Sequence, residues 1–262
     1  MREQNEDRCL TRAYAGTLLL AVADGVGGEP GGALASETAI RALERTFVPP
    51  GYNESARSAL SAAVQAANGA VVTAGGGRTD GAGATTLVAA AVRGREAAIA
   101  NLGDSRAYVV RAGAARQITA DHSGDRVHSI TRFLGDPRGV QPDIFVETLE
   151  RGDRLLLCSD GLTIHVGDAE IARIAAGTPD AAADALVALA KERGGDDNVT
   201  VVIYAAPLRQ AKSGLVGTII LAVLLALVVA GTLAAVLSGP PTAPSVPPSP
   251  LPAVSAAPTA SP

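Results

Sequence analysis

The sequence has few of the residues that usually build redox, disulfide or thiolate–metal sites. Its 262 residues include no tryptophan, one methionine, two cysteines and three histidines. Two cysteines exclude a disulfide framework and a cysteine-rich zinc site. Cys158 follows three leucines, so we expect it to be a small buried hydrophobic residue. His122, His128 and His165 stand apart in the sequence, and we expect neutral surface or hydrogen-bonding roles for them rather than metal ligation.

Charged residues are absent from the last fifty positions, because no Asp, Glu, Lys or Arg follows Lys212. The preceding part carries 22 basic and 26 acidic residues, which gives a formal net charge of −4. Without a basic excess, binding to the phosphate backbone of nucleic acid is disfavoured, and we expect no nucleic-acid partner. The length and the change in composition predict one globular domain over residues 1–207, followed by segments of a different kind.

Residues 215–237 form an uncharged apolar run of 23 residues. As a helix that rises about 1.5 Å per residue, this run spans roughly 35 Å, which exceeds a bilayer core of about 30 Å. Few helices of this length in soluble proteins are apolar on every side, so we predict one C-terminal transmembrane helix in contact with membrane lipid. The distance of this run from the N-terminus excludes a signal peptide.

The flanks of this run predict its orientation. Arg209 and Lys212 precede it and no basic residue follows, so the positive-inside rule places the N-terminal domain in the cytoplasm. The chain is then a single-pass protein of the cell membrane, with residues 208–214 as a juxtamembrane linker. Residues 238–262 contain nine of the sixteen prolines among Ala, Ser, Thr and Val, which predicts a disordered Pro/Ala/Ser-rich tail.

Hydrophobic patterning in residues 1–207 predicts clusters of strands with helices between them. Apolar runs predict strands at 18–23, 87–92, 97–102, 107–110, 155–158 and 199–204, with a hairpin turn at 111–113. Helical spacing predicts helices at 34–47, 56–72, 169–175 and 181–191, the last two with Asp168 and Asp180 as N-caps. Because helices do not follow every strand, an α+β layered fold is favoured over a doubly wound parallel sheet.

Acidic residues stand at the ends of four predicted strands. Asp24 and Asp160 are each followed by a glycine, and Asp104 is preceded by one. Asp197 lies two residues after Gly195. One Asp-Gly pair alone is an ordinary turn, but four in one domain indicate carboxylates that converge on one sheet edge. Such a cluster needs a cation, and oxygen ligands without His or Cys select Mg²⁺ or Mn²⁺. Two such ions about 3.5–4 Å apart are a recognised arrangement for hydrolysis of phosphate esters.

Seven short motifs carry a family resemblance. In chain order they are REQNED (2–7), ADGVGG (23–28), GATT (83–86), NLGDSRAY (101–108), DHS (121–123), CSDGL (158–162) and DDNVT (196–200). In this order, over residues 1–204, they resemble the metal-dependent protein serine/threonine phosphatases of the PPM or PP2C class. The bacterial members are the most similar, because Val26 stands where animal enzymes typically carry histidine.

The resemblance implies an αββα sandwich, in which two antiparallel sheets are flanked by helices, and two Mn²⁺ or Mg²⁺ ions at one sheet edge. Asp24 is similar to the carboxylate that bridges both ions, and Gly25 to a ligand through its backbone carbonyl. Asp160 and Asp197 resemble the acids that complete the first metal site. Hydrolysis is then carried out by a metal-activated water, without a covalent phospho-enzyme.

Four further residues receive roles from the same resemblance. Glu6 is similar to the acid of the second metal, and Asp7 to its neighbour. Arg2 resembles the arginine that binds the substrate phosphate, and Asp104 the acid of a third, weaker metal site. Ile164 stands where family members commonly carry an acid, so we expect a third ion to bind weakly or not at all.

The implied substrates are phosphorylated proteins, and the implied biological role is to oppose a serine/threonine kinase, including one anchored in the same membrane. One alternative is a catalytically weak regulator that binds phosphoproteins through the same fold. It rests on two departures: the chain begins just before the 5–7 segment, without the usual preceding strand, and residues 121–135 are fewer than in the family's flap. A second alternative is a phosphatase of a small phosphorylated metabolite or of an anti-sigma-type regulator.

Overall fold

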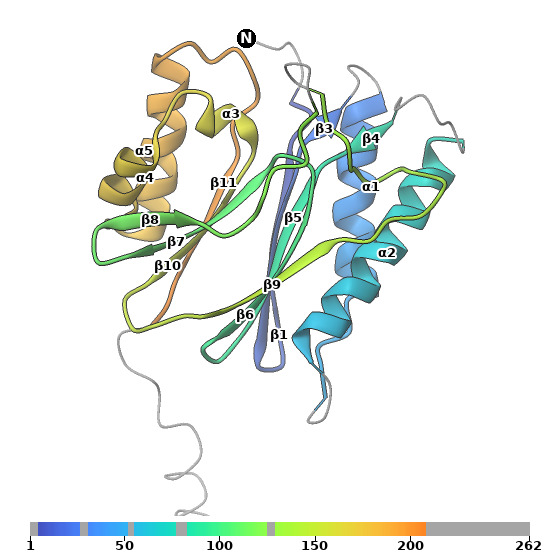
Figure 1. Ribbon diagram of the computed structural model, residues 1–262, viewed down its shortest axis with the longest axis horizontal. Coiled ribbons are helices and arrows are strands. Elements are labelled where there is room, and N and C mark those ends of the chain that lie inside the picture. Colours follow the sequence, from blue (N-terminus) through green and yellow to red (C-terminus); the bar gives the residue numbers. More distant parts are fainter. Residues whose placement is uncertain (1–4, 27–30, 52–54, 77–82, 125–128, 208–262) are drawn as a thin grey trace, which may run out of the picture. The chain divides into compact units, whose positions relative to one another are not determined.

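The computed structural model describes residues 5–26, 31–51, 55–76, 83–124 and 129–207. Its elements, labelled in Figure 1, are β1 (Arg8–Tyr14), β2 (Thr17–Ala23), β3 (Gly25–Val26), α1 (Gly31–Thr46), α2 (Ala56–Ala74), β4 (Ala84–Thr85), β5 (Leu87–Arg93), β6 (Glu96–Leu102), β7 (Arg106–Arg111), β8 (Ala114–Gln117), β9 (Asp143–Thr148), β10 (Arg154–Cys158), α3 (Asp160–Thr163), α4 (Asp168–Ala175), α5 (Pro179–Glu192) and β11 (Val201–Ala205). All six predicted strands and all four predicted helices are present. The strands β1, β3, β4, β8 and β9 were not predicted.

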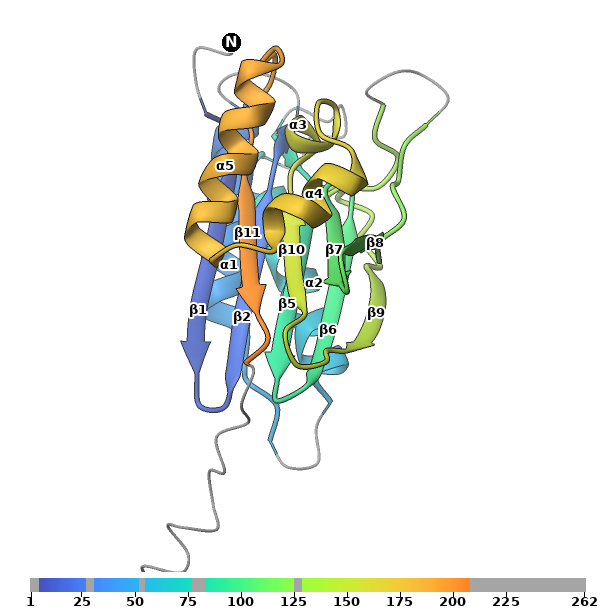
Figure 2. The ribbon, with the colours of Figure 1, turned by 90° about the vertical axis from the view of Figure 1, so that its left-hand side faces the viewer.

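Two antiparallel sheets form the centre of the domain. One has the strand order β1-β2-β5-β6-β9 and the other β11-β10-β7-β8, while β3 and β4 make a separate short ladder. The helices α1 and α2 cover the outer face of the first sheet (Figure 1), and α3, α4 and α5 lie over the second (Figure 2). The predicted αββα arrangement of helices and antiparallel sheets is therefore confirmed.

Buried apolar residues fill three spaces, one under each helical layer and one between the sheets. Strand β2 contributes to two of them, because Leu19 and Ala21 face the α1–α2 layer while Leu20 and Val22 face the second sheet. A strand buried on both faces is apolar at every position, so its sequence reads as a continuous run rather than an alternation. This burial explains why the central strands were the easiest to predict.

The predicted turn at 111–113 connects β7 and β8 as a tight hairpin. Arg111 pairs with Ala114, so only Ala112 and Gly113 lie in the loop, and their φ angles are 51° and 81°. Positive φ at both central residues is the type I′ geometry that matches the twist of a hairpin. The hairpin prediction is confirmed.

The N-cap predictions for the two later helices were wrong. Gly167 caps α4, and Thr178 caps α5 with Pro179 at its start. Asp168 and Asp180 instead lie within the first turns, where a carboxylate interacts favourably with the helix dipole.

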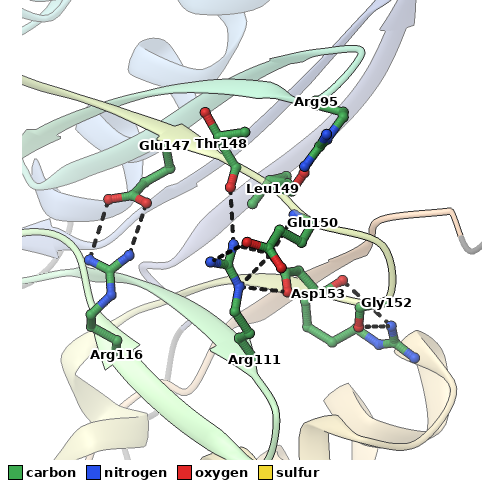
Figure 3. A network of polar contacts seen from close by, with 10 residues as sticks. Arg95, Arg111, Arg116, Glu147, Thr148, Leu149, Glu150, Gly152 and Asp153 are labelled. Atoms are coloured by element: carbon green, nitrogen blue, oxygen red, sulfur yellow. Dashed lines mark hydrogen bonds and ion pairs between the residues drawn. The ribbon is translucent and has the colours of Figure 1, made fainter.

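A polar network ties the two sheets together at the turn before β10 (Figure 3). Asp153 is 2% exposed, and Arg111 of β7 donates hydrogen bonds of 3.0 and 2.6 Å to its two carboxylate oxygens. Arg111 also donates to the carbonyl of Thr148 in β9, and the Glu150 N–H donates to Asp153. Burial alone would raise the pKa of Asp153, but the Arg111 and Glu150 hydrogen bonds outweigh it and the pKa lies below its ordinary value.

This network predicts a pH-dependent contribution to stability. A carboxyl group with a depressed folded pKa stabilises the fold above its unfolded pKa, near 4, and that contribution is lost as the pH falls through the folded value. We therefore expect Asp153→Asn to lower the free energy of unfolding by about 1–3 kcal/mol at pH 7 and by much less near pH 3. Urea unfolding at both pH values tests this, with exposed Asp184→Asn as control. A deficit as large at pH 3 as at pH 7 would contradict it.

No helix within the described ranges is long and apolar enough to cross a membrane. The predicted linker at 208–214, span at 215–237 and tail at 238–262 all lie outside the described residues. These three assignments stay predictions.

Candidate metal centre

Asp24 lies where β2 ends and β3 begins, and it is 8% exposed. Its backbone is held on both sides: the Asp24 N–H donates to Thr86 Oγ1 at 3.0 Å, and its carbonyl accepts from the Thr86 N–H at 2.8 Å. The Thr85 hydroxyl donates to the same carbonyl at 2.8 Å. These three hydrogen bonds fix the main chain of Asp24 and do not use its carboxylate oxygens.

Glu6 lies two residues before the start of β1 and is 2% exposed. Its N–H donates to Asn198 Oδ1 at 2.8 Å, which joins the N-terminal segment to the loop that precedes β11. Its carbonyl accepts hydrogen bonds from the Gly25 N–H and from the Ser36 hydroxyl of α1. Three distant parts of the chain therefore meet at the backbone of Glu6.

Asp7 is 3% exposed and lies beside the end of β10. The Ser159 hydroxyl donates to Asp7 Oδ2 at 2.7 Å. The other oxygen, Asp7 Oδ1, is buried and has no hydrogen-bond donor among the described residues. A buried carboxylate oxygen without a donor is costly, and a cation is one partner that would satisfy it.

The acids of this region repel one another. Burial first, and then the carboxylates of Asp7, Asp160 and Asp197, raise the pKa of Asp24 well above its ordinary value. Burial also raises the pKa of Asp7, and burial together with Asp160 raises the pKa of Asp104 to about 6. Positive charge placed among these groups would relieve both the repulsion and the desolvation.

Two glycines allow the segments of the site to approach closely. A Cβ added to Gly25 would lie 2.4 Å from the backbone carbon and oxygen of Gly32, at the start of α1. A Cβ added to Gly161, in α3, would lie 2.1 Å from the carbonyl oxygen of Asn198. Both distances are shorter than real Cβ contacts, so only glycine permits these approaches.

Asp7, Asp24, Asp160 and Asp197 lie close enough for their charges to interact, but the structure does not show them as a finished coordination sphere. In the described ranges, no three side chains of His, Cys, Asp or Glu form a group that could hold a metal ion. α3, which begins at Asp160, and β3, which follows Asp24, lie at the same end of the sandwich (Figure 1). Arg2 lies outside the described residues. The donor set is oxygen only, and with buried Asp7 Oδ1 it fits hard divalent cations.

Comparison with known proteins gives the family. The family model described as protein phosphatase 2C matches residues 2–192. The chain belongs to the protein phosphatase 2C family. It is therefore an enzyme of the serine/threonine phosphatase type, as its motifs predicted, and this family uses Mn²⁺ or Mg²⁺.

Named relatives and solved structures agree with this family. The serine/threonine phosphatase stp of Listeria innocua is 35% identical over 216 residues, which cover 73% of this chain and 86% of that protein. PstP of Mycobacterium tuberculosis is 37% identical over 225 residues, which cover 78% of this chain and 42% of PstP. A crystal structure of a bacterial serine phosphatase matches with a TM-score of 0.72 at 32% identity, covering 80% of this chain and 95% of that one. The catalytic domain of PstP, solved in complex with two manganese ions, matches with a TM-score of 0.67 at 37% identity, covering 78% and 92%.

Several residues that support the acids of this phosphatase domain were not assigned roles from the sequence. Thr86 holds the backbone of Asp24, Ser159 donates to Asp7, and Asn198 accepts the Glu6 N–H. All three lie within the recognised motifs GATT, CSDGL and DDNVT. Their position beside the acids was the available signal, but the bonds they make join segments 62, 152 and 192 residues apart.

Proposed function

We propose that this chain removes phosphate from phosphoserine and phosphothreonine in proteins, with two Mn²⁺ or Mg²⁺ ions as cofactors. The observation that carries the proposal is Asp24, a buried carboxylate among the carboxylates of Asp7, Asp160 and Asp197. Hard divalent cations prefer such oxygen donors and would neutralise the cluster. The two manganese ions in the 37% identical PstP catalytic domain support the same assignment.

The proposed ligands follow from the family motifs and the location of these residues. Asp24 would bind both ions, and the Gly25 carbonyl would be a further ligand. Asp160 and Asp197 would bind the first ion and Glu6 the second, while Ser159 keeps Asp7 oriented beside them. When bound, the ions supply a water that loses its proton near neutral pH and positive charge that offsets the phosphate. The protein's own contribution is to hold these acids in place before substrate arrives, through the main-chain bonds of Asp24 and Glu6.

Other residues are proposed to act on the substrate or on a third ion. Arg2 would bind the substrate phosphate, because a guanidinium forms paired hydrogen bonds with phosphoryl oxygens and keeps its charge at any working pH. Asp104, whose pKa is raised by burial and by Asp160, is the proposed ligand of a third ion that binds weakly because Ile164 offers no oxygen. Val26 has no titratable group, so the proton for the leaving alkoxide comes from another donor.

A direct assay tests this function. The full chain, purified in mild detergent, is incubated with phosphothreonine peptides and with an aryl phosphate, in Mn²⁺ or after chelation. We expect turnover that requires Mn²⁺, disappears on chelation and returns when Mn²⁺ is added back. Turnover that is insensitive to chelation would refute the proposal. Mn²⁺ binding without turnover would favour the phosphoprotein-binding regulator, and turnover of small phosphates alone would favour the metabolite phosphatase.

We propose further that residues 215–237 anchor this domain to the cell membrane and that the domain faces the cytoplasm. The support is the uncharged length of this run and the position of Arg209 and Lys212 before it. An anchored phosphatase meets substrates held at the same membrane, so a membrane-bound serine/threonine kinase and its targets are the proposed partners.

A topology experiment checks the anchor. A reporter that is active only outside the cytoplasm is fused after Pro262, and the matched control carries the same fusion with residues 215–237 deleted. The proposal predicts an active reporter in the first fusion and an inactive one in the control. A cytoplasmic signal from the first fusion would overturn the span or its orientation.

A further inference from the structure

His122 lies in the segment between β8 and β9 and connects two parts of the domain. It is 8% exposed, and its Nδ1 atom accepts a hydrogen bond of 3.1 Å from the backbone N–H of Gly103. On the other side of the ring, Nε2 lies 2.9 Å from Asp143 Oδ2 at the start of β9. The expectation from sequence, that His122 has a neutral hydrogen-bonding role, fits this position, but its partners were not foreseen.

The two contacts together indicate which tautomer a neutral ring adopts. Because Nδ1 accepts the Gly103 N–H, the proton of a neutral imidazole is on Nε2, which donates it to Asp143. Arg132 Nη1 donates to the other Asp143 oxygen at 2.8 Å. The same Nη1 lies 2.8 Å from Nε2, but in this tautomer Nε2 carries the proton and cannot accept, so Arg132 acts on Asp143 rather than on the ring. Asp143 and Arg132 thus hold the ring with its acceptor directed at Gly103.

Gly103 in turn packs against the residue that holds Asp24. Its φ is +107°, and a Cβ at this position would lie 2.7 Å from Thr86 Cβ. The turn at Gly103 is therefore in close contact with the Thr86 side chain. The Thr86 hydroxyl accepts the Asp24 N–H and makes a 2.8 Å hydrogen bond with Ser105. A continuous series of contacts therefore leads from Asp143 through His122, Gly103 and Thr86 to Asp24.

We propose that His122 is a positioning residue that holds the Gly103–Asp104 turn against Thr86 and so fixes the carboxylates of Asp24 and Asp104. The bond that does this is the one from the Gly103 N–H to Nδ1. The catalytic part of this inference rests on the proposed function, whereas the positional part concerns the chain alone. The His122 N–H also donates to the Gly103 carbonyl at 3.0 Å, so a changed side chain leaves one main-chain bond in place.

Two substitutions of His122 test the hydrogen bonds of Nδ1 and Nε2 separately. Asparagine places its amide oxygen near the position of Nδ1, whereas glutamine places its amide near the position of Nε2. His122→Asn should keep an acceptor for the Gly103 N–H and lose the bond to Asp143, and His122→Gln should do the reverse. A role in general stability alone predicts similar losses in both variants.

The readouts are hydrogen exchange of the Gly103 amide in metal-free protein, Mn²⁺ affinity by calorimetry, and kcat and KM for a phosphothreonine peptide. For His122→Gln we expect Gly103 to exchange at least about 10-fold faster and Mn²⁺ affinity to fall roughly 10–100-fold, as for other residues that orient metal ligands. His122→Asn should stay within about threefold of wild type in both measurements, by the same reasoning. Equal losses in both variants, no loss in either, or the reverse order would overturn the proposal.

Two outcomes, wild type that does not hydrolyse phosphopeptide and variants that do not fold, are decided by other measurements. If wild type binds Mn²⁺ but hydrolyses no phosphopeptide, the proposed function fails, while Gly103 exchange still decides the positional claim. If neither variant folds, wild-type NMR decides it, because the Gly103 N–H···Nδ1 bond requires a scalar coupling between those two nitrogens. Absence of that coupling would overturn the role of His122.

Discussion

Asp24→Asn is expected to lower kcat/KM for a phosphothreonine peptide at least roughly 100-fold, because it removes the central charge of the proposed metal site. Asparagine keeps the size of the side chain and leaves the main-chain bonds to Thr86 available. The loss should therefore appear in activity and in Mn²⁺ affinity rather than in folding. Steady-state kinetics over a range of Mn²⁺ concentrations measures both.

The same substitution should stabilise the metal-free protein. Burial and three neighbouring carboxylates raise the pKa of Asp24, so its ionisation disfavours the folded state once the pH exceeds the unfolded pKa near 4. The contribution of Asp24 to the stability of the metal-free protein should accordingly become more unfavourable as the pH rises above 4, so the stability that Asp24→Asn gains over wild type should increase over that range. Exposed Asp184→Asn on α5 is the matched control and should change neither quantity. If Asp24→Asn destabilised the metal-free protein and lost activity in proportion, the carboxylate would be a structural rather than a metal-binding group.

Five of the six strands that the sequence predicted have a neighbour on each side in the sheet, and the sixth, β11, is at a sheet edge. Among the strands that it missed, β3 and β4 have only two residues each, while β1, β8 and β9 are each at a sheet edge and have exposed side chains along much of their length. An edge strand is held by main-chain bonds to one neighbour and needs no apolar run. For β9 the pairing partner, β6, lies some forty residues earlier in the chain, so no local pattern could identify it.

The acids of the site were predictable for a related reason. Asp24, Asp104 and Asp160 follow buried strands, so the end of each apolar run predicts the place where the acid leaves the sheet. No local sequence pattern identifies the residues that hold these acids in place. Thr86 looks like one more threonine at a strand start, and His122 stands alone in sequence, although its bonds reach Gly103 and Asp143, 19 and 21 residues away. Their roles depend on tertiary contacts that no spacing rule contains.

Gly161→Ala is expected to reduce both stability and activity, because it drives apart two halves of the candidate site. The new Cβ would lie 2.1 Å from the Asn198 carbonyl oxygen. Relief requires a shift of α3, which begins at Asp160, or of the loop that carries Asp197 and whose Asn198 accepts the Glu6 N–H. Overpacking of this kind costs about 1–3 kcal/mol of unfolding free energy, and a misplacement of about 1 Å costs roughly 100-fold in rate.

Gly69→Ala supplies the control with the opposite expected sign. Gly69 is exposed within α2, and a Cβ there would meet nothing within 4 Å. Alanine in a helix interior is favoured over glycine by roughly 0.5–1 kcal/mol, so this variant should gain stability and keep full activity. Urea unfolding and kcat/KM are measured for both proteins. If Gly161→Ala behaved like Gly69→Ala, the close approach of α3 to Asn198 would not be what brings Asp160 and Asp197 together.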